Sequence, residues 1–177
     1  MQEDADGEDG AIGASINQAV VSLSALVDSL LDISKLDAGA VHPQPQRVNL
    51  QNILRRVEGD FRPVASAKSL QVVVSALDVE VHTDAFLLER VVRNLVDNAL
   101  KYTASGSVTL RAQLQQDTHV QIEVQDTGPG IAVEERERIF EEFYQIGNSE
   151  RDRTQGLGLG LAIVWRLTRL LDLQVGL

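Results

Sequence analysis

The sequence has 177 residues, and its 44% hydrophobic content is enough for one packed domain with one accessory element. The absence of cysteine excludes disulfides and thiolate metal sites, and the net charge of −10 argues against a general surface for nucleic acid or anionic membrane. No apolar run approaches the roughly 20 residues that span a bilayer, and the acidic start is unlike a signal peptide. We therefore expect a cytoplasmic segment without membrane contact, beginning with a solvated, flexible tail over residues 1–10.

An amphipathic helix is predicted over residues 11–40, and Gly39 is a suitable helix stop. Its apolar residues alternate at spacings of four and three: Ile12, Ile16, Ala19, Leu23, Leu26, Leu30 and Ile33, with Val20, Val27 and Leu31 beside them. Such a wide stripe suits a helical bundle, but a helix lying on the core of its own domain carries the same pattern. Residues 41–47 contain Pro43 and Pro45 and are expected to form an extended linker.

The main domain is expected over residues 48–177, and most of its elements follow from hydrophobic periodicity. Asn49 can cap a helix in which Pro63 marks a kink or an end, and Thr83 or Asp84 can cap a second helix. The other predicted elements, in chain order, are strands at 71–75 and 79–82, the second helix at about 85–102, a β-hairpin at 108–114 and 119–125, a short charged helix at 132–140, and a final helix from 161.

Three polar residues of the helix over 85–102 share one side. Asn94, Asn98 and Lys101 stand at i, i+4 and i+7, and asparagine is a poor helix former. Amide oxygens can hold a hard cation such as Mg²⁺, and a lysine one turn further can reach the phosphates that the cation binds. The alternative is an ordinary solvated face.

Asp126 follows the second strand of the predicted hairpin. If the alternation of Val120, Ile122 and Val124 continues, its carboxylate faces inward and needs a donor, such as a ligand amino group. The alternative is that Asp126 caps its own turn, which continues through Gly128 and Gly130.

The run Gly156-Leu157-Gly158-Leu159-Gly160 precedes the final helix. Glycines allow close backbone approach, and the N-terminus of a helix attracts anions, so the run is a candidate phosphate loop, although loops also collect glycine for turns and caps. Before it, residues 146–155 are polar and can form a mobile lid, in which Arg151 and Arg153 either meet phosphate or are simply solvated. We expect Phe140, Phe143 and Tyr144 to anchor the near end of this loop rather than stack on a ligand.

Four of these segments, in this order, resemble the nucleotide-binding boxes of the histidine kinase ATPase domain. Residues 94–103 resemble the N box, 126–130 the first glycine box, 139–143 the phenylalanine box, and 156–160 the second glycine box. The resemblance covers residues 48–177 and extends to the wider GHKL (Bergerat) superfamily of gyrase-type topoisomerases and heat-shock chaperones. It implies an α/β two-layer sandwich, a mixed sheet with helices on one face, that binds ATP and Mg²⁺.

The resemblance also implies roles for individual residues. Asn98 and Lys101 are the implied catalytic residues, with Asn98 and Asn94 as the metal ligands and Lys101 as a phosphate contact. Tyr102 is implied as a wall of the nucleotide pocket, and Asp126 as the acceptor for the adenine amino group. The remaining implied contributors to the adenine and phosphate ends of the pocket are Gly128, Gly130, Ile131, Gly156, Leu157, Gly158, Leu159 and Gly160.

The implied function is that of a protein-histidine kinase catalytic domain in a two-component system, with a response regulator as a further partner. His42, His82 and His119 lack the context of a phosphoacceptor, so we expect the accepting histidine outside this chain and no autophosphorylation by the chain alone. Residues 11–40 resemble the second helix of the dimerisation and phosphoacceptor hairpin, which implies a homodimeric parent protein that is either free or membrane-anchored. Residues 175–177 resemble the start of a strand, which suggests truncation at the C-terminus.

Two other functions remain open. One is a non-catalytic module for nucleotide sensing or dimerisation. The other is an ATPase of the chaperone or topoisomerase type, which the phenylalanine box makes the less favoured of the two.

Overall fold

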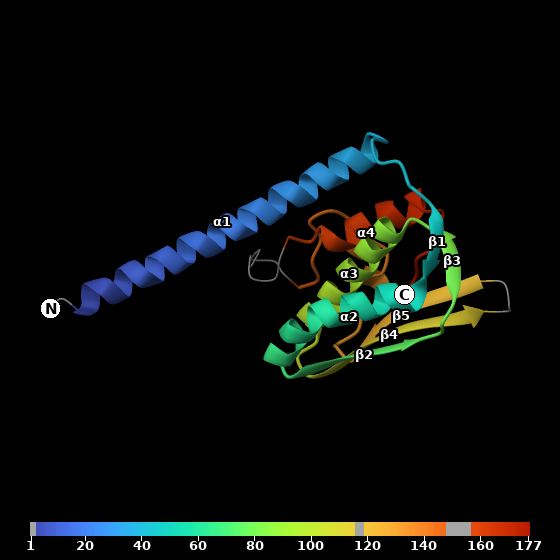
Figure 1. The fold of residues 1–177 in the computed structure, drawn as a ribbon. Coiled ribbons are helices and arrows are strands. Elements are labelled where there is room, and N and C mark those ends of the chain that lie inside the picture. Colours follow the sequence, from blue (N-terminus) through green and yellow to red (C-terminus); the bar gives the residue numbers. More distant parts are fainter. Residues whose placement is uncertain (1–2, 116–118, 148–156) are drawn as a thin grey trace.

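The computed structural model describes residues 3–115, 119–147 and 157–177 (Figure 1). Its elements are α1 (Glu3–Asp37), β1 (Gln46–Asn49), α2 (Leu50–Ala67), β2 (Leu70–Ala76), β3 (Glu80–Thr83), α3 (Ala85–Tyr102), β4 (Gly106–Gln115), β5 (His119–Asp126), the 3₁₀ turns η1 (Val133–Glu135) and η2 (Arg138–Phe140), and α4 (Gly160–Leu170). No helix in the described ranges has the length and apolar character needed to cross a bilayer.

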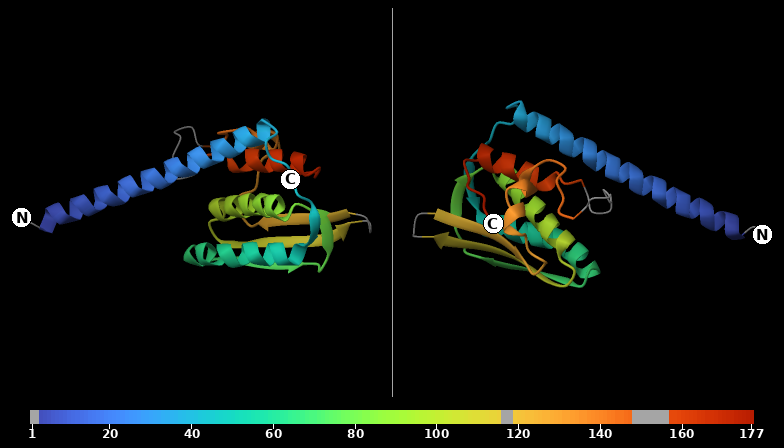
Figure 2. Two further views of the ribbon diagram at one scale, coloured as in Figure 1. Left: turned by 45° about the horizontal axis from the view of Figure 1, so that its top comes forward. Right: turned by 180° about the vertical axis from the view of Figure 1, so that it is seen from behind.

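The domain is a two-layer sandwich, as predicted. Its main sheet has the order β2-β4-β5, with β2 parallel to β4 and β4 antiparallel to β5. Helices α2 and α3 pack on one face of this sheet, α4 packs on α3, and α1 packs on α4 (Figure 2). Strands β1 and β3 form a separate antiparallel pair at the end where the linker enters.

Helix α3 separates two hydrophobic clusters. Alternate residues of β4, Val108, Leu110 and Ala112, face α2 and α3 and are buried, because successive side chains of a strand point to opposite faces. On its other side α3 contributes Leu87 and Val91 to a second cluster. That cluster also contains Ile33 of α1 and Leu159, Ile163, Val164 and Leu167 at and within α4.

Two predicted caps form, and the second also holds the linker. Asn49 accepts from the N–H of Asn52 at the start of α2. Asp84 accepts from the N–H of Leu87 at the start of α3, and its other carboxylate oxygen accepts from the N–H of Gln44 at 2.7 Å. The buried Asp84 therefore ties the linker to the domain before β1 begins.

Two boundaries at the start of the chain differ from those predicted. Helix α1 begins at Glu3, so residues 3–10 continue the helix instead of forming an irregular tail. The segment contains no proline, and extending an existing helix is far easier than starting one. The linker is shorter than residues 41–47, because Gln46 and Arg47 pair with Thr83 and His82 as the first residues of β1.

Pro63 does not end helix α2, because Val57 and Ala65 are buried on either side of it and hold the helix on the core; a kink there stays a prediction. Two further predictions need correction. Residues 132–140 form two 3₁₀ turns instead of one helix, since Ile139 alone among them is buried and a short helix needs packing to persist. Residues 173–177 form no strand, because they pair with no described strand and the N–H of Leu173 instead closes α4 by donating to Thr168.

The C-terminal part of α1 lies on the domain, whereas its first two thirds project away from it (Figures 1 and 2). Ile33 is buried, and Asp32 pairs with Arg90 of α3. Asp37 accepts from Nε and Nη2 of Arg166 on α4 at 2.7 and 3.2 Å. Ile16 and Leu23, by contrast, are 59% and 60% exposed. The stripe therefore packs on its own domain at Ile33 and leaves Ile16 and Leu23 uncovered.

The pKa of Asp37 is lowered from 3.8, chiefly by the hydrogen bond from Arg166. A carboxyl group whose pKa falls on folding stabilises the fold above its unfolded pKa and loses that contribution as the pH drops through the folded value. We therefore expect the difference in unfolding free energy between wild type and Asp37→Asn to be constant above about pH 5 and to decrease in more acidic solution. Urea titrations at a series of pH values measure it, and a difference that grows on acidification would contradict the assignment.

Candidate functional site

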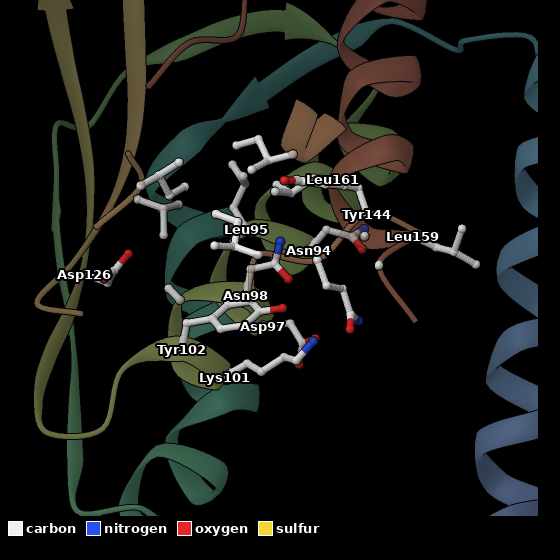
Figure 3. A pocket seen from close by; sticks show the side chains of 18 of the residues that line it. Asn94, Leu95, Asp97, Asn98, Lys101, Tyr102, Asp126, Tyr144, Leu159 and Leu161 are labelled. Carbon is white, nitrogen blue, oxygen red and sulfur yellow. The ribbon is translucent and has the colours of Figure 1, made fainter. Parts of the chain in front are cut away.

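A cavity of about 570 Å³ lies between α3, the end of β5 and the segment that leads into α4 (Figure 3). It gathers most of the residues that the sequence analysis selected. These are Asn94, Asn98, Lys101, Tyr102, Asp126, Gly130, Ile131, Leu157, Gly158, Leu159 and Gly160. Three segments that are far apart in the sequence therefore line one space, although the role of each residue stays a prediction.

The two asparagines face the start of α4. Asn94 donates from Nδ2 to the carbonyl of Arg90 at 2.8 Å, which leaves its amide oxygen for the cavity. A Cβ atom placed on Gly160 would lie 3.3 Å from Oδ1 of Asn94 and 3.8 Å from Oδ1 of Asn98. Both asparagines are half-buried, so their side is not the ordinary solvated face that was the alternative. Glycine at position 160 lets the amides and the helix start approach closely.

Amide oxygens are also the donors that a divalent cation would find here. Within the described ranges, no group of three His, Asp or Glu side chains could hold a metal ion. Mg²⁺ usually takes one or two protein ligands, keeps several waters and binds substrate phosphates, so it does not need such a cage. The oxygens of Asn94 and Asn98 on the wall of the cavity fit that mode of binding.

Lys101 and Tyr102 form the outer end of the α3 face. The ammonium of Lys101 lies 4.7 Å from the centre of the Tyr102 ring, and Tyr102 is 44% exposed. In Figure 3 the α3 side chains lie between Asp126 on one side and Leu159 on the other. A ligand in the cavity would thus meet an anionic acceptor at one end and a cation near its middle.

Asp126 combines the two alternatives set out for it. Its Oδ1 caps the turn by accepting from the N–H of Gly128 at 2.7 Å, and the hydroxyl of Thr103 lies 3.4 Å from the same oxygen. No hydrogen bond to Oδ2 is found among the described residues. The prediction that Asp126 is buried is wrong. The residue is exposed toward the cavity, because β5 ends at Asp126, beyond the helices that cover the sheet. Oδ2 is therefore available to a ligand donor.

Gly128 is the one described member of the predicted set that does not line the cavity. It lies behind Asp126, where an added Cβ would stand 2.7 Å from Oδ1 of Asp126 and 3.3 Å from the carbonyl of Tyr102. Its contribution is close packing behind the acceptor. Gly156, Arg151, Arg153 and most of the predicted lid lie outside the described residues.

The start of α4 has the features of an anion site. Leu159 is the N-cap residue and its side chain makes no capping hydrogen bond. Gly158 has a φ of +71°, and a Cβ there would stand 2.9 Å from backbone atoms of Phe143 and Tyr144. Only glycine fits this combination of backbone angle and contact. The N–H groups of the first turn are thereby presented next to the cavity.

The aromatic residues before the lid hold this loop from the other side. The rings of Phe140 and Trp165 of α4 are 5.5 Å apart, and the N–H of Phe143 donates to the carbonyl of Gly158 at 3.1 Å. Tyr144 also lines the cavity, so it is more than an anchor. Its hydroxyl donates to Glu135, whose carboxylate raises the pKa of Tyr144.

Several cavity residues had no predicted role. Leu95, Asp97, Ile139, Gln145, Ile146, Leu161 and Ile163 line it, together with Ser29 of α1. Asp97 and Leu95 lie within the N box, so their position on the same helix was the available signal. Thr103 is the last residue of the N box, but its buried position beneath Asp126 depends on how the end of α3 packs against the end of β5. Ser29 becomes a neighbour of the site only through the docking of α1.

Residues 83–176 match the family of histidine kinase-, DNA gyrase B- and HSP90-like ATPases. The chain belongs to this family. The resemblance noted in the sequence is thereby confirmed, and the match runs from the last residue of β3 to Gly176. The cavity lies within this ATPase domain, apart from its contact with α1.

Two similar proteins are sensor kinases. The autoinducer 2 sensor kinase/phosphatase LuxQ of Vibrio parahaemolyticus is 35% identical over 158 residues, which cover 85% of this chain and 18% of LuxQ. The sensor histidine kinase RcsC of Escherichia coli is 30% identical over 94% of this chain and 18% of its own length. The chain thus spans about a fifth of these relatives. The crystal structure of full-length ShkA with AMPPNP superposes with a TM-score of 0.73, at 34% identity over 84% of this chain and 31% of ShkA.

Replacing Gly158 or Gly130 by alanine should separate backbone strain from steric conflict. Both glycines have positive φ, +71° and +73°, but a Cβ on Gly130 has no neighbour within 4 Å. We expect Gly130→Ala to lower the unfolding free energy by about 1–2 kcal/mol, the cost of left-handed backbone for an L-residue. Gly158→Ala should cost more and also disturb the loop to Phe143. Chemical denaturation measures both, and equal losses would contradict the packing described for Gly158.

Proposed function

We propose that this chain is the ATP-binding catalytic domain of a protein-histidine kinase in a two-component signalling system. It binds Mg-ATP and transfers the γ-phosphate to a histidine that this chain does not contain. The observation that carries the proposal is the cavity that joins Asn94, Asn98 and Lys101 to Asp126 and to the start of α4. Membership of the ATPase family and the sensor-kinase relatives support it.

Asp126 sets the orientation of the nucleotide in this proposal. The exocyclic amino group of adenine donates to Oδ2 of Asp126, while Oδ1 remains bound to the turn at Gly128. Tyr102, Gly130 and Ile131 then border the nucleotide between Asp126 and the phosphates. One carboxylate accepts the hydrogen bond of the adenine amino group, and apolar surface supplies the rest of the contact with the base.

Phosphoryl transfer needs positioning and neutralisation of charge more than covalent chemistry from the protein. Lys101 neutralises phosphate charge from α3, and the N–H groups at the start of α4 donate to phosphate oxygens across the cavity. Asn98 and Asn94 would hold Mg²⁺ through their amide oxygens, and the bound ion would supply positive charge that offsets the charge of the phosphates.

The accepting histidine and the response regulator belong to other parts of the signalling system. The exposed stripe on the first two thirds of α1 suits a second helix of a dimerisation and phosphoacceptor hairpin, in a homodimeric parent protein. We infer that the domain acts in the cytoplasm, where ATP is available, whether or not the parent is anchored in a membrane. A nucleotide-sensing module without transfer, or a chaperone-type ATPase, is less well supported, since LuxQ and RcsC are sensor kinases.

Transfer to a separate acceptor tests the proposal. With Mg²⁺ and γ-labelled ATP, the chain should label a supplied phosphoacceptor hairpin, and Asn98→Ala should slow labelling by about 100-fold or more, the usual loss when a group that stabilises transition-state charge is removed. Asn52→Ala, an exposed amide on α2 outside the cavity, is the matched control and should label normally.

Two outcomes would favour the other functions. ATP binding without label on any hairpin would support the nucleotide-sensing module. Steady ATP turnover without a protein acceptor would support the chaperone-type ATPase.

The adenine contact is tested with Asp126→Asn. The substitution replaces a charged acceptor by a neutral amide, and we expect ATP affinity to fall by about 10- to 100-fold, because hydrogen bonds to charged groups contribute about 1.5–3 kcal/mol. Guanine presents a carbonyl in place of that amino group, so the preference for ATP over GTP should also shrink. Calorimetric titration measures both. Asp78→Asn, outside the cavity, is the control, and wild-type affinity in Asp126→Asn would refute the contact.

A further inference from the structure

Arg166 of α4 contacts three separate groups at once. Its Nε and Nη2 donate to the carboxylate of Asp37, the last residue of α1, and Nη2 also donates to Glu142. Its Nη1 donates to the carbonyl of Ala162 at 3.3 Å, one turn back along α4. The Arg166 side chain is 22% exposed, whereas Asp37 and Glu142 are 55% and 36% exposed. A partly covered guanidinium therefore joins α1 to the segment that contains Glu142.

Glu142 is directly followed by a residue that holds the candidate phosphate loop. The N–H of Phe143 donates to the carbonyl of Gly158, and the backbones of these two residues are in close contact. Phe143 has a φ of +61°, a conformation that a non-glycine residue keeps only when its surroundings hold it there. The pairing of Glu142 with Arg166 is part of those surroundings, so it helps to fix the position of Gly158.

We propose that Arg166 is a positioning residue that couples the docking of α1 to the phosphate end of the nucleotide site. With α1 docked, Asp37 and Glu142 together hold the guanidinium, and Phe143 and Gly158 are held in the arrangement that presents the start of α4. When α1 leaves, Arg166 loses one of its two carboxylates and the loop is less restrained. The inference rests on the proposed function, because it takes the segment from Gly158 to Gly160 to receive phosphates.

The chain has the mechanical arrangement that such coupling needs. Asp84 holds the linker at Gln44, and β1 pairs with β3 immediately afterwards, so α1 can move relative to the domain only through residues 38–43. Asp37 stands directly before this stretch and is a direct contact between α1 and α4. Burial of Ile33 and the Asp32–Arg90 pair also hold α1 on the domain, and a partly exposed ion pair contributes little by itself, so the contact of Asp37 with Arg166 adjusts the docking of α1 rather than determining it. Because coupling between two binding events is reciprocal, phosphate binding must favour docking by the same factor.

Nucleotide affinities of carboxylate variants test the coupling. We expect Asp37→Asn and Glu142→Gln each to weaken MgADP binding by about two- to fivefold, the range of a partly exposed ion pair, and to leave adenosine binding unchanged, because adenosine lacks phosphates. In an Arg166→Met background, Asp37→Asn should have no further effect. Asp60→Asn is the matched control, since Asp60 is a comparably exposed carboxylate paired with Arg93 between α2 and α3.

The reciprocal effect separates coupling from a general loss of stability. The sequence lacks cysteine, so spin labels at Ser24→Cys on α1 and Gln71→Cys on β2 report the position of the helix without competing thiols. MgADP should raise the docked fraction in the wild type and should not do so in Asp37→Asn. Equal losses in Asp60→Asn, an effect of Asp37→Asn that persists without Arg166, or an equal loss for adenosine would each overturn the inference. Failure of the wild type to bind MgADP would overturn the proposed function as well.

Discussion

The structure depends on helix α3, which packs against neighbours on two sides and lines the cavity with a third. One side of this helix packs on β4 and β5 with α2, another packs on α4 and receives Ile33 of α1, and a third carries Asn94, Asn98 and Lys101 into the cavity. A helix has room for this only if small or polar residues are confined to the strip between its two apolar sides. The two clusters hold α3 from both directions, and the polar strip is held in place by packing that does not involve it.

This constraint explains why so few polar contacts are needed to build the site. Asn94 is fixed by a single hydrogen bond to its own helix, and its neighbour across the cavity is Gly160, at the start of a helix whose buried residues pack on α3. The distance between the amides and the helix start is thus set by apolar side chains such as Leu87, Val91 and Val164. Because Gly160 has no Cβ atom, the start of α4 can approach these amides closely.

Much of the fold could be predicted from the sequence because its elements have strong local signals. The strands β4 and β5 alternate cleanly, and α3 has both an N-cap and a continuous apolar side, so its bounds were predicted correctly. The members of the site could be selected because a resemblance supplied the association between four distant segments. Exposure of Asp126, the place of Thr103 beneath it and the contact of Ser29 with the cavity depend on how elements pack, and no local pattern encodes that. The helix predicted over residues 132–140 does not form, because the segment buries too little surface to sustain a helix despite its helical spacing.

The bond between Asp84 and Gln44 gives the long helix the geometry of a lever. Because the linker is fixed at its domain end, α1 turns about a short fulcrum next to Gly39, whose φ of +64° and open surroundings leave it free of steric contact. At about 1.5 Å per residue, its 35 residues make an arm of about 50 Å. A rotation of about 10° at the fulcrum would carry the far end through about 9 Å. Small rotations beside the ATPase domain would thus become large displacements at the distant end of α1. A force applied at that end would be amplified at the end of α1 that contacts the domain.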